Sequence, residues 1–340
     1  MGFRIAINGY GRIGRSLLRA FYESDDRGEL EIAAVNDLAD INSVAYLTRY
    51  DSTHGRFPGR VSHRDNTMFI NDDPIRVISE RTLSNLPWKE LNIDAVMECT
   101  GSFTDRKTAE CHLKAGAKKV VFSQPADHMD IDATIVYGIN HKRLKRDCAV
   151  ISNASCTTNC IVPVLKLLDD ELGIDHGFMT TIHSMMNDQQ VIDAFHPKDL
   201  RMSRSAGQSI VPVSTGLAQG VEKILPNLSG RFESASIRVP TINVSAIDLT
   251  VMVSRNTNRE FVNAVIREAA DGYLKGILGY TEDHQVSCDF NHDPRSSIVD
   301  GLETFVSGDR MVRVLSWFDN EWGYANRMLD TTRALLQAKV

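Results

Sequence analysis

The chain lacks several features that would point to a membrane or nucleic-acid partner. No run of 18 apolar residues occurs among its 340 residues, so the sequence predicts no membrane-spanning helix. The formal net charge of −6 leaves no basic surplus for binding nucleic acid. Its six cysteines include no C-x-x-C pair and no signal peptide is evident, which fits a reducing cytoplasm. We therefore expect a cytoplasmic protein without membrane or nucleic-acid partners.

The length and the hydrophobic share of 42% are sufficient for two domains with sizeable cores. Short apolar strand patterns alternate with helical patterns through the first half of the chain, which predicts an α/β domain with a parallel, doubly wound sheet. The predicted strands cover residues 3–7, 30–35, 69–70, 75–78, 95–101, 119–123, 133–137 and 149–151. This domain is placed at residues 1–155, completed by a C-terminal helix within 320–340.

The second half of the chain has a different sequence pattern. Apolar and polar residues alternate over longer predicted strands, and fewer helices lie between them. This pattern predicts an α+β domain with an antiparallel or mixed sheet over residues 156–319. The predicted strands cover residues 178–183, 234–240, 245–253, 287–290 and 310–318, with a helix at 261–274. A long polar segment at 184–209 separates the first of these strands from the rest.

A glycine-rich turn follows the first predicted strand, with the pattern G-x-G-x-x-G at Gly9, Gly11 and Gly14. Alone this motif is weak, but here it lies between a strand and a helix and a second strand follows, which is the dinucleotide-binding context. Gly9 permits the tight turn, Gly11 lets the backbone approach a pyrophosphate, and Gly14 lets helix and strand pack closely. The alternative is a turn that serves packing only.

Asp37 stands at the end of the second strand, 23 positions after Gly14. A carboxylate there would accept hydrogen bonds from the adenosine ribose and repel a 2′-phosphate, so the predicted cofactor is NAD rather than NADP. The alternative role for Asp37 is a helix cap. Thr100, Gly101 and Ser123 also follow parallel strands, and ligands of such sheets bind beyond those strand ends.

Cys156 lies in a short polar turn between an apolar strand and a helical pattern. The positive end of a helix favours the thiolate, which is the nucleophilic form. Lowering the thiol pKa from about 8.5 to about 6.5 requires about 2.7 kcal/mol, more than a helix end usually supplies, so a second partner should be near. The alternative for any cysteine, including Cys160 one helical turn later, is a buried inert residue.

His183 is the candidate base, because it ends a strand 27 residues after Cys156. An imidazole there could activate the sulfur and later take a proton from a thiohemiacetal hydroxyl. The alternative is a structural hydrogen-bonding histidine. Arg201, Arg204 and Arg238 are candidate anion-binding residues, although charges in a polar segment are often merely solvated. Together these features predict aldehyde oxidation through a covalent thioester.

Four motifs show a resemblance that covers nearly the whole chain. They are Asn-Gly-Tyr-Gly-Arg-Ile-Gly-Arg at 8–15, Ser-Cys-Thr-Thr-Asn-Cys at 155–160, Thr-Thr-Ile-His at 180–183 and Trp-Phe-Asp-Asn-Glu-Trp-Gly-Tyr at 317–324. In these motifs the chain resembles the glyceraldehyde-3-phosphate dehydrogenase superfamily. The resemblance implies a homotetramer that acts on a small sugar phosphate, with Cys156 as nucleophile, His183 as its activator and no metal.

The same resemblance assigns further residues. It places Arg12, Ile13, Arg81, Asn320 and Tyr324 in the cofactor site together with Gly9, Gly11, Gly14, Asp37, Thr100, Gly101 and Ser123. It places Ser155, Thr157, Arg201, Thr215, Gly216 and Arg238 in the substrate site. Asn320 would hold the nicotinamide carboxamide, and the segment 184–209 would lie near the cofactor of a neighbouring subunit.

Within the superfamily the chain is most similar to the D-erythrose-4-phosphate dehydrogenase branch, in the stretches 184–197, 286–294 and 326–332. Phosphorylating members have a phosphate-binding threonine three residues after the histidine and commonly Arg-Arg in the following loop, where this chain has Met186 and Arg201-Met202. A methionine cannot hold a phosphate oxygen. The expected reaction is therefore oxidation of D-erythrose 4-phosphate to 4-phosphoerythronate with hydrolysis by water, which serves pyridoxal 5′-phosphate synthesis. The alternative is the phosphorylating glyceraldehyde-3-phosphate dehydrogenase of glycolysis.

Overall fold

A computed structural model describes residues 2–25, 27–127, 129–197 and 199–339 of the chain. It contains two compact units, the first formed by Met1–Ser155 with Ala325–Val340 and the second by Cys156–Tyr324. In the described part of the chain no helix is both long enough and apolar enough to span a membrane.

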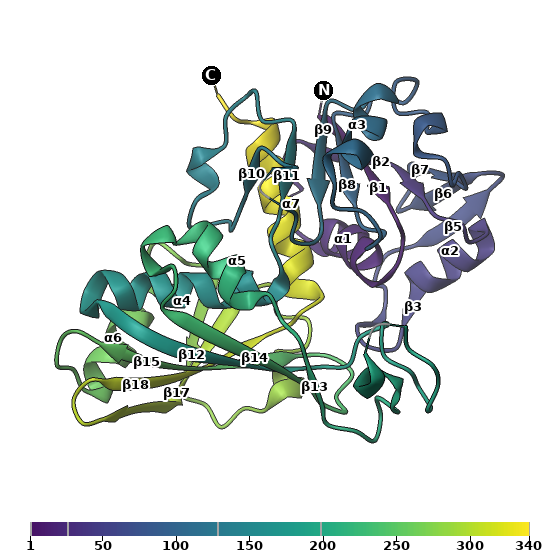
Figure 1. The fold of residues 1–340 in the computed structure, drawn as a ribbon. Coiled ribbons are helices and arrows are strands. Elements are labelled where there is room, and N and C mark those ends of the chain that lie inside the picture. Colours follow the sequence, from purple (N-terminus) through teal and green to yellow (C-terminus); the bar gives the residue numbers. More distant parts are fainter. Residues whose placement is uncertain (1, 26, 128, 198, 340) are drawn as a thin grey trace. The chain divides into compact units, whose positions relative to one another are not determined.

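The first unit is built on a nine-stranded sheet in the order β10-β11-β9-β8-β1-β2-β7-β6-β5 (Figure 1). The strands from β10 to β7 pair in parallel and β6 and β5 continue antiparallel. Its elements are β1 (Phe3–Asn8), α1 (Arg12–Glu23), β2 (Leu30–Asn36), α2 (Ile41–Arg49), β5 (Val61–Arg64), β6 (Thr67–Ile70), β7 (Asp73–Ile78), β8 (Ala95–Glu98), α3 (Arg106–Lys114), β9 (Lys119–Phe122), β10 (Ala133–Thr134) and β11 (Val150–Ser152). A separate pair, β3 (Tyr50–Asp51) and β4 (Gly55–Arg56), follows α2.

This topology confirms the predicted doubly wound α/β fold. The strand order turns back at β1, with β2 on one side and β8 on the other. Such a reversal leaves a crevice at the carboxyl ends of the strands, where nucleotides bind. The strands are apolar because helices and loops cover both faces; Ile5, Ala6 and Ile7 of β1, for example, are fully buried.

The second unit is built on a seven-stranded mixed sheet in the order β13-β14-β12-β15-β18-β17-β16, as predicted for this half (Figure 1). Its elements are α4 (Cys156–Leu172), β12 (Ile174–His183), β13 (Val211–Val213), α5 (Leu217–Ile224), β14 (Phe232–Arg238), β15 (Ser245–Val253), α6 (Arg259–Asp271), β16 (Leu278–Thr281), β17 (Ser297–Ser307), β18 (Met311–Phe318) and the start of α7 (Trp322–Leu336). Helices α4, α5 and α6 pack on one face of this sheet.

Along the strands of the second unit, successive side chains are alternately buried and exposed. This explains why apolar residues recur at every second position in their sequences. In β12, Met179, Thr181 and His183 are buried whereas Phe178 and Ile182 are exposed. Phe178 and Ile182 are apolar and Phe305 of β17 is also exposed, but the register places Thr250 and Arg313 between Phe178 and Phe305. This face of the sheet therefore carries large apolar side chains among polar ones.

Several local features differ from the predictions, and three of them have a clear physical basis or extent. Residues 287–290 form a short 3-10 helix, Ser287–Phe290, because the Asp289 carboxylate turns back and accepts a hydrogen bond from the Val286 N–H. The predicted strand at 133–137 ends at Thr134. The strand β17 was not predicted, because a bulge between Asp300 and Phe305 breaks the alternation that a strand normally shows.

Candidate functional site

The glycine turn of the first unit has the geometry that a dinucleotide requires. Gly9 has φ of +89°, and a Cβ there would lie 2.6 Å from the Thr100 nitrogen, so only glycine fits. A Cβ on Gly14 would lie 2.1 Å from the Gly9 carbonyl oxygen, which shows how closely α1 packs on the turn. At Gly11 no heavy atom of the described residues lies within 4 Å of the Cβ position, so a ligand could approach the backbone there. Ile13 belongs to the first turn of α1, whose N–H groups would face a pyrophosphate.

Asp37 is bound to the glycine turn. Its Oδ2 accepts a hydrogen bond of 2.7 Å from the Tyr10 N–H, and its Oδ1 accepts one of 2.9 Å from the Ala39 N–H. Each carboxylate oxygen has a further lone pair, so the group can still accept the two ribose hydroxyls. These contacts hold the carboxylate in place beside the turn, as a ribose-binding residue requires.

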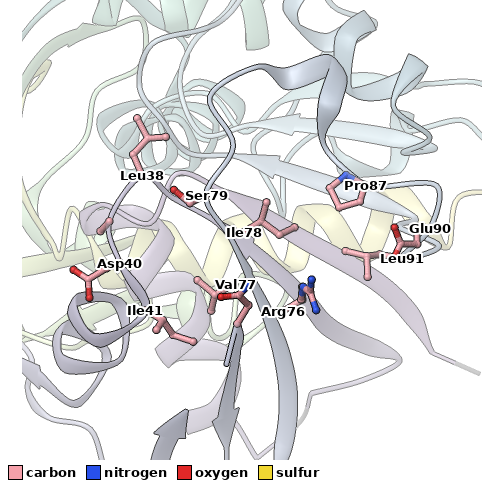
Figure 2. Close-up of a pocket in the computed structure, with 12 residues that line it drawn as sticks. Leu38, Asp40, Ile41, Arg76, Val77, Ile78, Ser79, Pro87, Glu90 and Leu91 are labelled. Atoms are coloured by element: carbon pink, nitrogen blue, oxygen red, sulfur yellow. The ribbon is translucent and has the colours of Figure 1, made fainter. Parts of the chain in front are cut away.

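A pocket of about 650 Å³ opens immediately after Asp37 (Figure 2). Residues 38–41, after β2, and Arg76–Ser79, at the carboxyl end of β7, line one part of it, and Pro87, Glu90 and Leu91 line another. This volume lies in the range of small-molecule sites. This pocket was not predicted from the sequence; a signal for it was the charged Arg76 within an apolar strand.

Arg12 of the glycine turn is held by an acidic partner. Its guanidinium forms an ion pair with Asp51, Nη1 on Oδ2 and Nη2 3.1 Å from Oδ1. The Asp51 side chain is 6% exposed, and its Oδ1 also accepts hydrogen bonds from the Thr53 and His54 N–H groups. Burial raises the pKa of Asp51, but Arg12 and the two N–H groups outweigh burial and lower it below its usual value.

Because of this ion pair, the free energy of unfolding should depend on pH in the acidic range. Because the folded pKa of Asp51 lies below the unfolded value, its contribution is complete above about pH 4 and is lost as the pH falls through the folded pKa. Asp51→Asn should lower the free energy of unfolding at neutral pH by about 1–3 kcal/mol. The difference between variant and wild type should shrink below pH 4 in denaturant titrations, and a difference that grew there would contradict the assignment.

The other predicted cofactor residues of the first unit lie at the same edge of the sheet. Thr100 and Gly101 follow β8, and Ser123 follows β9 with its N–H bonded to the Glu98 carbonyl at 3.0 Å. Arg81 is exposed and follows β7. The structure therefore brings these residues to the carboxyl ends of three parallel strands of the sheet, β7, β8 and β9.

In the second unit, Cys156 and His183 are brought together. Cys156 begins α4 and His183 ends β12, and the Cys156 Sγ lies 3.7 Å from the His183 Nε2. The His183 Nδ1 lies 2.8 Å from the Ser184 carbonyl oxygen, which can only accept. Nδ1 therefore carries the proton in the neutral ring, and the Nε2 lone pair faces the sulfur. This is the orientation that a base for the thiol needs.

Burial controls the charge state of this pair. It raises the pKa of the Cys156 thiol to about 11, although the charge of Arg238 opposes the shift. Burial and then Arg238 lower the pKa of His183 to about 4. The thiol shift is opposite to that predicted from the helix end, because desolvation outweighs the helix and the cation. Both groups are thus neutral near pH 7, and the proton must pass from Sγ to Nε2 as the sulfur attacks.

Arg238 is the charged neighbour of this pair. It ends β14, which pairs in parallel with β12 so that Arg238 lies directly beside His183. Its Nη1 lies 3.4 Å from the Ser184 carbonyl oxygen. Its Nε is buried without a hydrogen-bond acceptor among the described residues. A buried unsatisfied N–H of a cation is costly, so this group is suited to bind an anionic part of a substrate.

Asn320 is fixed by two serine hydroxyls. Its Oδ1 accepts hydrogen bonds from Ser184 Oγ at 2.9 Å and from Ser245 Oγ at 2.8 Å. These bonds hold the amide oxygen between the two serines and direct the NH2 group away from them. Since Ser184 also follows His183, the predicted carboxamide-binding residue and the predicted base share one neighbour.

The remaining predicted residues are spread over several elements. Thr157 is the second residue of α4, and Ser155 precedes that helix in the chain. Thr215 and Gly216 precede α5, with Thr215 Oγ1 accepting from the Leu217 N–H at 3.2 Å. Arg201 is exposed, whereas the neighbouring Met202 is buried. Tyr324 is buried within α7.

The doubly wound sheet with its glycine turn, together with a cysteine–histidine pair in the second unit, defines the class of NAD-dependent dehydrogenases. Residues 3–106 match the family described as glyceraldehyde 3-phosphate dehydrogenase, NAD binding domain. Residues 155–320 match the family described as glyceraldehyde 3-phosphate dehydrogenase, C-terminal domain. The chain belongs to the glyceraldehyde-3-phosphate dehydrogenase family, and its cofactor is NAD, which confirms both predictions.

Proposed function

We propose that this NAD-dependent dehydrogenase oxidises D-erythrose 4-phosphate to 4-phosphoerythronate, through a thiohemiacetal and a thioester on Cys156. The observation that carries the choice of substrate is Met186. It follows His183 by three residues, where the resemblance places a phosphate-binding threonine in phosphorylating enzymes, and its side chain is 46% exposed. A thioether cannot bind phosphate oxygens as a hydroxyl does, so inorganic phosphate is a poor nucleophile here and water takes its place.

The residues of the second unit supply each proton step. The thiol of Cys156 transfers its proton to Nε2 of His183 as the sulfur bonds to the aldehyde carbon, and His183 then gives that proton to the former carbonyl oxygen, which completes the thiohemiacetal. Bound NAD would supply the hydride acceptor for that carbon. His183 takes the hydroxyl proton as the hydride leaves, and a thioester results. Water then adds to the thioester carbon, the acid is released and the sulfur regains a proton.

The substrate proposal predicts a specific pattern of rates. With D-erythrose 4-phosphate the protein should reduce NAD at full rate without inorganic phosphate, with kcat/KM at least about tenfold above that for glyceraldehyde 3-phosphate. NADH formation measured with each substrate, with and without phosphate, decides between them. Met186→Thr restores a hydroxyl and should increase both phosphate dependence and triose activity. Strict phosphate dependence of the wild type with preference for the triose would identify the phosphorylating glycolytic enzyme instead.

We also propose that the protein is a homotetramer in the cytoplasm. Five large apolar side chains of the segment 184–210 are each at least 70% exposed. They are Val191, Ile192, Phe195, Leu200 and Ile210. With Phe178 and Ile182 on the sheet they form more apolar surface than an isolated chain ordinarily presents to water. Light scattering should give four times the mass of one chain, and Phe195→Asp should lower that mass. A monomer of full activity would contradict the proposal.

A further inference from the structure

A row of buried polar side chains crosses the carboxyl ends of three neighbouring strands in the first unit. Asn36 ends β2, Asn8 ends β1 and Glu98 ends β8, and the sheet places them side by side. Asn36 Nδ2 donates to Asn8 Oδ1 at 2.7 Å, and Asn8 Nδ2 donates to Glu98 Oε2 at 2.6 Å. All three side chains are at most 5% exposed. None of them belongs to the predicted cofactor or substrate residues.

Behind Glu98 the row continues into the core. His112 of α3 is fully buried, with its Nε2 3.0 Å from Glu98 Oε2. Trp88, also fully buried, donates its indole N–H to His112 Nδ1 at 3.0 Å. Because an indole can only donate, Nδ1 must be the acceptor, and the neutral ring then donates from Nε2 to Glu98. The indole thereby fixes the tautomer of the histidine.

Glu98 connects this row to the turns of the NAD site. Its Oε1 accepts hydrogen bonds from both the N–H and the hydroxyl of Thr100. The four donors to its carboxylate are all uncharged, and they match the acceptor capacity of an ionised carboxylate. Thr100 in turn forms the wall against which Gly9 packs, since a Cβ on Gly9 would lie within 2.7 Å of its N and Cα atoms. The position of the glycine turn therefore depends on Glu98.

At its other end the row reaches the segment after β7. Asn36 Nδ2 also donates to the Glu80 carbonyl at 2.9 Å, and the Glu80 N–H donates to Asn36 Oδ1 at 3.0 Å. Glu80 directly precedes Arg81, one of the predicted cofactor residues. One connected set of side chains thus sets the relative positions of the segments that follow β8, β1, β2 and β7.

We propose that Glu98 is a positioning residue for NAD, held by His112 and Trp88, and that the row from Trp88 to Asn36 preorganises the cofactor site. The inference rests on the NAD-dependent reaction proposed above and adds residues outside the predicted cofactor set. A carboxylate is needed because four donors converge on it. In Glu98→Gln one of these donors meets an NH2 group, so Thr100 or Asn8 must move and the glycine turn moves with it.

NAD titration by calorimetry of the full-length protein, without substrate, tests the proposal. Glu98→Gln should weaken NAD binding about 10- to 100-fold. His112→Gln retains an acceptor for Trp88 and a donor for Glu98, so its affinity should stay within about threefold of wild type. His112→Leu fills similar space but has neither the acceptor for Trp88 nor the donor for Glu98, so it should weaken NAD binding at least about tenfold. The matched control is Asp94→Asn at the opposite end of β8, where the carboxylate accepts from the Arg4 N–H at 2.7 Å and from Lys118 at 2.6 Å.

Thermal unfolding without NAD separates positioning from a general structural role. Asp94→Asn should lower the unfolding midpoint and leave NAD affinity unchanged. If His112→Leu bound NAD as well as His112→Gln did, the row would only fill space and the proposal would be overturned. Should His112→Leu fail to fold, the comparison of Glu98→Gln with Asp94→Asn decides, and equal NAD affinities of those two would reject the proposal. The titration contains no sugar phosphate, so a wrong substrate assignment would leave its result unaffected.

Discussion

Replacing Cys156 by serine should reduce NAD-dependent aldehyde oxidation by a factor on the order of 10³–10⁶ while NAD still binds. The serine hydroxyl is a far weaker acid than a thiol, so the neutral His183 beside it cannot generate the nucleophile at neutral pH. NAD binding should persist because the glycine turn and Asp37 belong to the other unit of the chain. NADH formation and NAD calorimetry on the same sample give both results.

Cys160 provides the matched control for this substitution. It lies one helical turn further along α4, fully buried, with its Sγ 3.6 Å from Ser297 Oγ. Cys160→Ser should therefore keep at least about half of the activity, since a hydroxyl can retain that contact. Alkylation by iodoacetamide distinguishes a catalyst from a protein that merely binds NAD, because in a catalyst His183 takes the thiol proton as the sulfur attacks, and Cys156 is then labelled rapidly and selectively despite its raised pKa. Undiminished oxidation by Cys156→Ser would refute the thioester pathway.

Replacing His183 by glutamine should lower kcat about 10²- to 10⁴-fold. Glutamine can keep the hydrogen bond to the Ser184 carbonyl but cannot accept a proton from the sulfur. The deficit in Cys156 alkylation should shrink as the pH rises toward the thiol pKa of about 11, because hydroxide then removes the proton without the imidazole. Alkylation rates measured from about pH 6 to about pH 10 report this convergence.

The same strand offers a control histidine. His176 lies in β12 as well but is exposed, so His176→Gln should leave both kcat and the alkylation profile unchanged. A His183→Gln profile parallel to that of wild type at every pH would show that the histidine orients the substrate rather than moving the proton.

The sequence predicted the features that depend on neighbours in the chain. The strand–glycine turn–helix pattern around Gly9 and Gly14 is local, and it led correctly to a dinucleotide-binding fold and, with Asp37, to NAD, whereas the family followed from the resemblance of four motifs. Period-two alternation found β12 and β15, whose two faces differ in burial. The same rule missed β17, where the bulge after Asp300 interrupts the period, and it misassigned residues 287–290, where a side chain caps its own turn.

Features that depend on tertiary pairing could not be predicted. Arg238 was a candidate because of its charge, but its place beside His183 follows from the parallel register of β12 and β14. The raised thiol pKa follows from burial, which no motif reports. Glu98 and His112 are 14 residues apart in different elements, and only the sheet and α3 together bring them into contact.

The hydrogen bonds from the Ser184 and Ser245 hydroxyls to Asn320 have a stereochemical consequence. The two serine hydroxyls hold the amide oxygen between them, so the NH2 group of Asn320 keeps one direction. With Asn320 holding the carboxamide as predicted, the nicotinamide ring cannot turn over, and its two faces stay distinct throughout the catalytic cycle. A deuterium label on the aldehyde carbon would then arrive at a single prochiral position of the reduced dinucleotide.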